Sequence, residues 1–102
     1  MAIVGQSLAS GQLQDVKSPL YTSVGVTYEK TLCLCNTGGS TELIKLYFRQ
    51  SGMSSFRIRT ISLDPDQSYE LTIALPMSAG DKIEGETTNS NVVDFVLGGG
   101  VS

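Results

Sequence analysis

Residues 42–62 read ELIKLYFRQSGMSSFRIRTIS, and this stretch decides the fold class. Apolar side chains recur at every second position on both sides of a Ser-Gly-Met segment, the pattern of a half-buried β-hairpin. Pairing Phe48 with Phe56 and Leu46 with Ile58 leaves a three-residue loop in which glycine is available for a left-handed conformation. The alternation reverses after residue 60, which predicts a β-bulge or the strand end there. This register puts six side chains on one inner face: Ile44, Leu46, Phe48, Phe56, Ile58 and Thr60.

The two-residue period continues along the chain after residue 20, and no segment of ten or more residues shows a helical period. Turn-forming residues separate the apolar runs, among them 36–40 and 64–67, where Pro65 favours a type I turn. Seven strands are expected, at 23–27, 30–36, 42–50, 54–62, 68–75, 81–88 and 92–97. These short, evenly spaced strands predict an all-β fold, a single antiparallel β-sandwich or jelly-roll-like barrel of about seven to eight strands.

The two ends of the chain have a different composition from the middle. Residues 1–20 carry only Asp15 and Lys17 as charges, and their apolar residues fit neither period. We expect an extended N-terminal arm at 1–20 that orders against a neighbour, with an edge strand plus coil as the alternative. Residues 21–98 are expected to form the sandwich domain and 99–102 a flexible C-terminal tail. The strand at 92–97 is apolar on both faces, which predicts a central strand or one covered by a partner.

The composition argues against enzyme chemistry. The 102 residues include no His, and their net charge is −3. A Ser-His-Asp triad, a Cys-His nucleophile and a His-ligated zinc site are therefore excluded. Cys33 and Cys35 project from the same face of a strand as parallel side chains, which is unfavourable for a disulfide, and we interpret them as half-buried hydrophobic residues. No catalytic, metal-binding or cofactor-binding residue is expected, and no cofactor.

No targeting or membrane segment is apparent. The first basic residue is Lys17, and polar residues interrupt the apolar run that a secretory signal needs. No window approaches the length of a membrane span. We therefore expect a chain that is made in the cytoplasm and has no membrane partner.

Basic residues are concentrated in the 42–62 hairpin, where Lys45, Arg49, Arg57 and Arg59 give a charge of +4. In the register above, Lys45 faces Arg59 and Tyr47 faces Arg57. We hypothesise that this hairpin meets an acidic surface on a neighbouring copy or a larger partner; the alternative is pairing with later acids of the same chain. This cluster of cations contains a single aromatic residue, and the rest of the chain is acidic. Both observations argue against nucleic acid as the partner. The candidate partner-contacting residues are Lys45, Tyr47, Arg49, Arg57 and Arg59 of the hairpin, and Ile3, Val4, Leu8 and Leu13 of the arm.

Three turn motifs carry a family resemblance. They are Asn36-Thr37 at a strand end, Asp64-Pro65-Asp66-Gln67-Ser68 before an alternating strand, and Ala79-Gly80-Asp81-Lys82-Ile83 before the last hairpin. In this arrangement, from residue 20 onward, the chain resembles small virion structural proteins of tailed bacteriophages.

The resemblance implies a non-enzymatic protein on the surface of a capsid. Decoration or cement proteins and head-fibre bases are the implied roles, and neck or tail components are the next. The implied partners are the major capsid protein or another virion protein, together with further copies of the chain, with a trimer favoured. A carbohydrate- or receptor-binding tail module is a further alternative, although few aromatic residues are left over from the expected core to build a sugar site.

Overall fold

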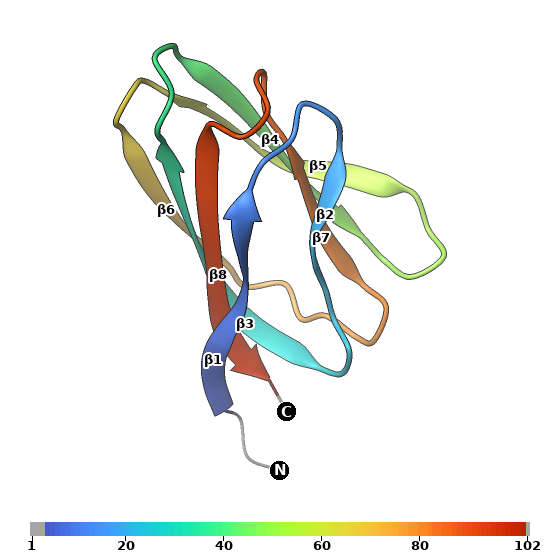
Figure 1. Cartoon of the computed structure of the whole chain (residues 1–102). Helices are drawn as coiled ribbons and strands as arrows, with labels where there is room; N and C mark the ends of the chain where they lie inside the picture. The colour runs from blue at the N-terminus through green and yellow to red at the C-terminus, as the bar shows by residue number, and fades with distance from the viewer. Residues whose placement is uncertain (1–3, 102) are drawn as a thin grey trace.

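The structure, a computed structural model, describes residues 4–101, with the side chains of residues 4–7, 28, 29 and 101 left aside. Within this range the chain forms strands only, packed as two layers (Figure 1). The strands are β1 (Val4–Gln12), β2 (Ser18–Thr22), β3 (Thr27–Asn36), β4 (Glu42–Arg49), β5 (Ser55–Leu63), β6 (Ser68–Ile73), β7 (Lys82–Glu86) and β8 (Val93–Val101).

The strand order is that of a jelly roll. Sheet A has the order β1-β8-β3-β6 and sheet B has the order β2-β7-β4-β5, with every pairing antiparallel. The first strand pairs with the last, the second with the seventh, the third with the sixth and the fourth with the fifth. This is one long antiparallel ribbon rolled into two facing sheets, the arrangement that defines the jelly roll. The expected fold class is confirmed, and β8 is a central strand, as its two apolar faces predicted.

The two ends of the chain belong to the sandwich: the N-terminal residues follow the alternative expectation of an edge strand and not that of an arm, and the expected C-terminal tail is part of β8. Strand β1 pairs with β8 along its whole length, and β2 pairs with β7. Glycines 98–100 lie inside β8, between β1 and β3. Residues 23–26 of the strand expected at 23–27 form the loop after β2, and Thr27 begins β3. The N-terminal sequence shows no two-residue strand period, because a bulge at Leu8 and another between Pro19 and Tyr21 interrupt the alternation of inward and outward side chains.

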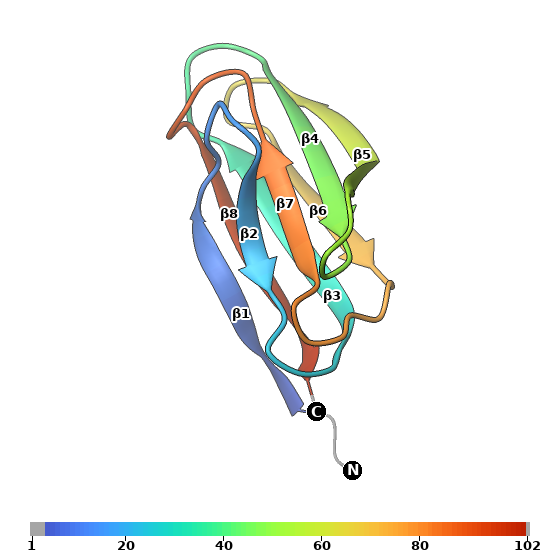
Figure 2. The same cartoon turned by 90° about the vertical axis from the view of Figure 1, so that its right-hand side faces the viewer.

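The core lies between the sheets and comes from the inward positions of both. Figure 2 shows the two layers from the side on which β2, β7 and β4 face the viewer. Buried and more exposed side chains alternate regularly along β3 and β8. The fully or nearly fully buried apolar side chains are Leu13, Leu32, Leu34, Ile44, Leu46, Ile61, Leu63, Ile73, Met77, Ile83, Val93, Phe95 and Leu97.

The β4–β5 hairpin has the expected start but a different register farther on. Phe48 lies opposite Phe56, as expected, and Gly52 is left-handed with φ 74°. Leu46 then lies opposite Arg59 rather than Ile58, so that Ile58 is the extra residue of a bulge. The bulge lies two residues before the expected place. It turns Ile61 and Leu63 into the core, and it therefore accommodates the reversed alternation.

Two charged side chains, Glu42 and Lys30, are fully buried. Glu42 accepts hydrogen bonds from the Thr87 hydroxyl at 2.9 Å and from the Asn89 amide and side chain at 2.8 and 2.7 Å. Burial alone would raise the pKa of Glu42, but these hydrogen bonds together hold it below its ordinary value. Lys30 donates to the carbonyl of Leu75, and burial lowers the pKa of its amine.

Asp81 connects three loops at one end of the sandwich. Its carboxylate accepts hydrogen bonds from the backbone N–H groups of Ser51 and Ser78, each at 2.9 Å. Its carbonyl accepts the N–H of Ser23 at 2.8 Å. The neighbouring Gly80 has φ 89° and donates its N–H back to the carbonyl of Ser23. The β2–β3, β4–β5 and β6–β7 loops are thereby held as one unit.

Candidate interaction surface

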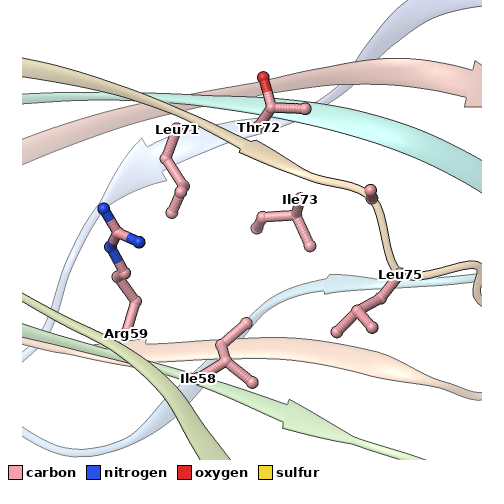
Figure 3. A pocket seen from close by; sticks show the side chains of 7 residues that line it. Ile58, Arg59, Leu71, Thr72, Ile73 and Leu75 are labelled. Carbon is pink, nitrogen blue, oxygen red and sulfur yellow. The ribbon is translucent and has the colours of Figure 1, made fainter.

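The sandwich is open on the side between β5 and β6, which are the outer strands of the two sheets. These strands are joined by the turn 64–67 but are not hydrogen-bonded to one another, and they diverge from that turn (Figure 1). A groove of about 210 Å³ lies between them, lined by Ile58, Arg59, Leu71, Thr72, Ile73, Ala74 and Leu75. Figure 3 shows Arg59 and Ile58 projecting from β5 toward Leu71 and Ile73 of β6.

Large apolar side chains are exposed along this opening. Phe56 is 67% exposed, Leu75 41% and Ile58 36%. By register Phe56 is on the inner side of sheet B, as expected, but β6 has diverged too far to cover it. Although Phe56 lies on the expected face, neither Phe56 nor Ile58 is buried in the core, which corrects the expected inner-face packing of the hairpin. The open side is defined here as Phe56, Ile58, Arg59 and Leu75, together with Arg57, which projects from the outer face of the same edge strand β5.

The bulge at Ile58 decides where Arg59 points. Because Arg59 lies opposite the inward-facing Leu46, it projects into the opening and not onto the outer face. Its guanidinium donates a hydrogen bond to the Tyr69 hydroxyl at 2.5 Å and lies 5.8 Å from the centre of the Tyr69 ring. Lys45 consequently faces Thr60 and not Arg59, which is a correction to the expected charge pairing.

The other hairpin cations lie on the outer face of sheet B, where acids of β7 meet two of them. Arg49 is 3.5 Å from the carboxylate of Glu84, and Lys45 lies opposite Glu86. The Tyr47 hydroxyl donates to Glu86 at 2.5 Å, and this hydrogen bond, with burial and the nearby carboxylate, raises the pKa of Tyr47. For Arg49 the alternative of pairing with a later acid of the same chain is therefore the one observed, whereas Lys45 is a strand neighbour of Glu86 without an ion pair among the described side chains. Arg57 is exposed and forms no ion pair with any side chain that the structure describes.

The arm candidates occupy different environments. Leu13 is fully buried in the core and is not accessible to a partner, while Leu8 is partly buried against the core. Val4 begins β1, but its side chain, like the whole of Ile3, lies outside the described residues. The two arm candidates with described side chains thus pack in or against the core, Leu8 from β1 and Leu13 from the loop that follows it.

The outer face of sheet A has the opposite charge from the open side. Cys33 of β3 lies between Glu70 of β6 and Val96 of β8, and Asp94 is two residues from Val96 on the same face. The side chains are short, and the described residues of this face include no Lys or Arg. The acidic face is defined here as Cys33, Glu70, Asp94 and Val96, all of which are exposed.

We expect replacement of Glu70 by glutamine to make Cys33 more reactive. Desolvation, the charge of Glu70 and a hydrogen bond to its carboxylate at 3.8 Å raise the pKa of the Cys33 thiol. Removing the charge should lower that pKa and increase the thiolate fraction. The rate of alkylation by iodoacetamide at pH 8 should rise several-fold, with Glu84→Gln as a control distant from the thiol. An unchanged alkylation rate would contradict the assigned contact.

The described residues contain no group of three His, Cys, Asp or Glu side chains that could hold a metal ion. Nor do they include a helix long and apolar enough to cross a membrane. What the open side offers instead is apolar area with the Arg59 guanidinium in the opening and Arg57 on the outer face of the same edge strand, which suits a protein surface with apolar and acidic residues.

Known proteins share the fold of this chain. Neither a family model nor a curated protein sequence matches it. A chain of the disulfide-linked pili of Bacillus endospore appendages is similar, with a TM-score of 0.54 and 12% identity over 98% of this chain and 89% of that one. A chain of the infectious bursal disease virus Gx strain is also similar, with a TM-score of 0.56 and 10% identity over 98% of this chain and 33% of that one. A chain of the T13 IBDV particle, from an icosahedral virus, has a TM-score of 0.53 and 8% identity over 98% of this chain and 31% of that one.

These likenesses establish a shared fold. This chain spans about a third of the length of the two viral chains and most of the pilus chain. The shared architecture is the two-sheet antiparallel sandwich, which the pilus chain uses in a fibre and the viral chains in a particle.

The cations Arg57 and Arg59 could be predicted from the sequence, but the groove between β5 and β6 could not. The groove depends on how far β5 and β6 diverge, and no local pattern reports that divergence. One signal was available, because the reversed alternation after residue 60 required a bulge somewhere in β5. Moving the bulge to Ile58 would have placed Arg59 correctly.

Proposed function

We propose that the chain is a non-enzymatic structural subunit of a virion, most closely a capsid decoration or cement protein. The observation that carries this proposal is the open side, where a sandwich without a described polar cleft presents exposed Phe56 and Ile58 beside Arg57 and Arg59. Exposed aromatic and aliphatic side chains flanked by arginine have the composition of a protein-binding patch. The occupant we propose is an apolar, acidic patch of another virion protein.

The fold and the turn motifs support the same role. Solved chains with this fold build a pilus and an icosahedral particle, and the resemblance to tailed-phage virion proteins rests on three turns of this sequence. A carbohydrate-binding tail module is the second candidate. It is less favoured because only Phe56 among the aromatic side chains with described burial is largely exposed.

The test is binding to capsids of the virus that encodes the chain, assembled without it. Purified wild-type chain is sedimented with these capsids, and the bound fraction is compared with that of a Phe56→Ser/Arg57→Glu variant. We expect at least a tenfold loss of affinity, because an aromatic side chain that binding would bury and a charge contact are removed together. Val16→Ser is the matched control, since Val16 is 63% exposed and lies in the β1–β2 loop, away from the open side.

Equal binding by wild type and the open-side variant would overturn the assignment of the site. No binding by the wild type, together with a positive glycan array, would favour the carbohydrate-binding module instead.

A further inference from the structure

The open side and the acidic face are two separate surfaces of the same chain with complementary chemistry. We propose that the open side of one copy binds the acidic face of a second copy. This inference rests on the proposed function in taking the open side as a contact surface, and it adds a second copy of this chain as a partner.

The charges of the two surfaces are opposite in sign and equal in number, with Arg59 in the opening and Arg57 on the outer face of the edge strand β5. Arg57 and Arg59 form no ion pair with any carboxylate among the described side chains, and neither do Glu70 and Asp94 with any cation there. Asp94 accepts only the Gln12 side chain, at 3.0 Å, and Glu70 accepts the Cys33 thiol. Both surfaces thus carry two charges without a charged partner. Complementary patches of this kind steer association and fix its register.

The apolar residues of the two surfaces also match. Phe56 and Ile58 project from the open side, whereas on the acidic face Val96, 50% exposed, lies next to Asp94 along β8, and Cys33 lies between Val96 and Glu70. Short side chains surround Val96, which lets a bulky aromatic ring approach the sheet closely. The contact would therefore have an apolar centre with ion pairs at its rim, the usual anatomy of a specific interface.

Contact between two different surfaces has a consequence for symmetry. A heterologous contact leaves one open side and one acidic face free on any linear assembly, so copies add until a ring closes or a filament forms. The open side lies between the sheets and the acidic face is the outer surface of sheet A, so the two surfaces meet at a corner of the sandwich. Each contact around this corner therefore rotates the added copy relative to the previous one. We therefore expect a small closed ring, with a mass that is a low multiple of 10.9 kDa.

The test uses two charge-reversed variants of the full chain. Arg57→Glu/Arg59→Glu makes both surfaces acidic, and Glu70→Lys/Asp94→Lys makes both basic. Sedimentation velocity over a concentration series is expected to show association of the wild type and at least tenfold weaker association of each variant alone. An equimolar mixture of the variants should associate again, because opposite charges then face one another. Raising the salt concentration should weaken the wild-type assembly.

Two controls separate this result from misfolding. Arg57→Glu alone keeps the hydrogen bond between Arg59 and Tyr69, and it should weaken association in the same direction. Lys82→Glu reverses a charge on the outer face of sheet B and should leave the mass unchanged. A wild-type chain that stays monomeric at every concentration overturns the proposal, as does a mixture that fails to associate. If the wild type is monomeric but still binds capsids through the open side, the proposed function survives and this inference alone fails.

Discussion

Replacement of Glu42 by alanine is expected to lower the free energy of unfolding by about 3 kcal/mol, measured by urea denaturation at pH 7. The Glu42 carboxylate is fully buried and accepts three hydrogen bonds, from Thr87 and twice from Asn89. Removing it leaves these donors without an acceptor, and hydrogen bonds to a charged group contribute about 1.5–3 kcal/mol each. The bonds hold the β7–β8 loop against the start of β4.

The loss of stability caused by Glu42→Ala should depend on pH in a defined direction. The pKa of Glu42 is lower in the folded chain than its ordinary value, so its contribution is present above the ordinary glutamate pKa and is lost as the pH falls through the folded-state pKa. The stability difference between the wild type and Glu42→Ala should therefore shrink in acid. Asp15→Ala, at an exposed position in the β1–β2 loop, is the control and should change stability by less than about 0.5 kcal/mol. Equal stabilities of wild type and Glu42→Ala at pH 7 would refute the assigned network.

Asp81→Ala is expected to destabilise the chain by about 3 kcal/mol and to loosen three loops at once. Its carboxylate accepts the backbone N–H groups of Ser51 and Ser78 in a largely buried position. Both donors lose their partner in the variant, and each such loss costs about 1–3 kcal/mol. Hydrogen exchange at the Ser51 and Ser78 amides should accelerate more than exchange in the β3–β8 ladder. Asp81→Asn retains one acceptor oxygen, and it should give an intermediate loss.

If exchange accelerated uniformly across both sheets, Asp81 would be a general stability residue and not the link between loops. Because Ser51 belongs to the loop that leads into β5, loosening it should also disturb the position of Phe56 on the open side.

The regular strands were predictable and the irregular ones were not. Strands β3, β4, β6 and β8 follow a clean alternation, so their inward faces could be read from the sequence. Strands β1 and β2 each contain a bulge and few large apolar residues, and their pairing partners β8 and β7 lie at the far end of the chain. Pairing over such a sequence separation leaves no local pattern, which is why these residues resembled an arm.

The same distinction applies to the candidate surface. That Arg57 is an exposed cation could be inferred from its position in the hairpin, and the structure places it there. That Phe56 and Leu75 are exposed could not be inferred, because their alternation is the same as that of core residues. Exposure of these two side chains is set by the divergence of β5 and β6, a property of the assembled sheets. Glu42, a charged residue at an inward position, gave a signal in the sequence that points to a buried polar network.

The claim that the open side is covered in an assembled particle is tested most directly by hydroxyl-radical footprinting. The rate of modification of Phe56 and Ile58 is measured by mass spectrometry in the isolated chain and in purified particles that carry it, with the exposed Val16 as the internal reference. The account predicts at least fivefold protection of Phe56 and Ile58 in the particle relative to Val16. Equal rates of modification at Phe56 in the free and assembled chain would contradict it.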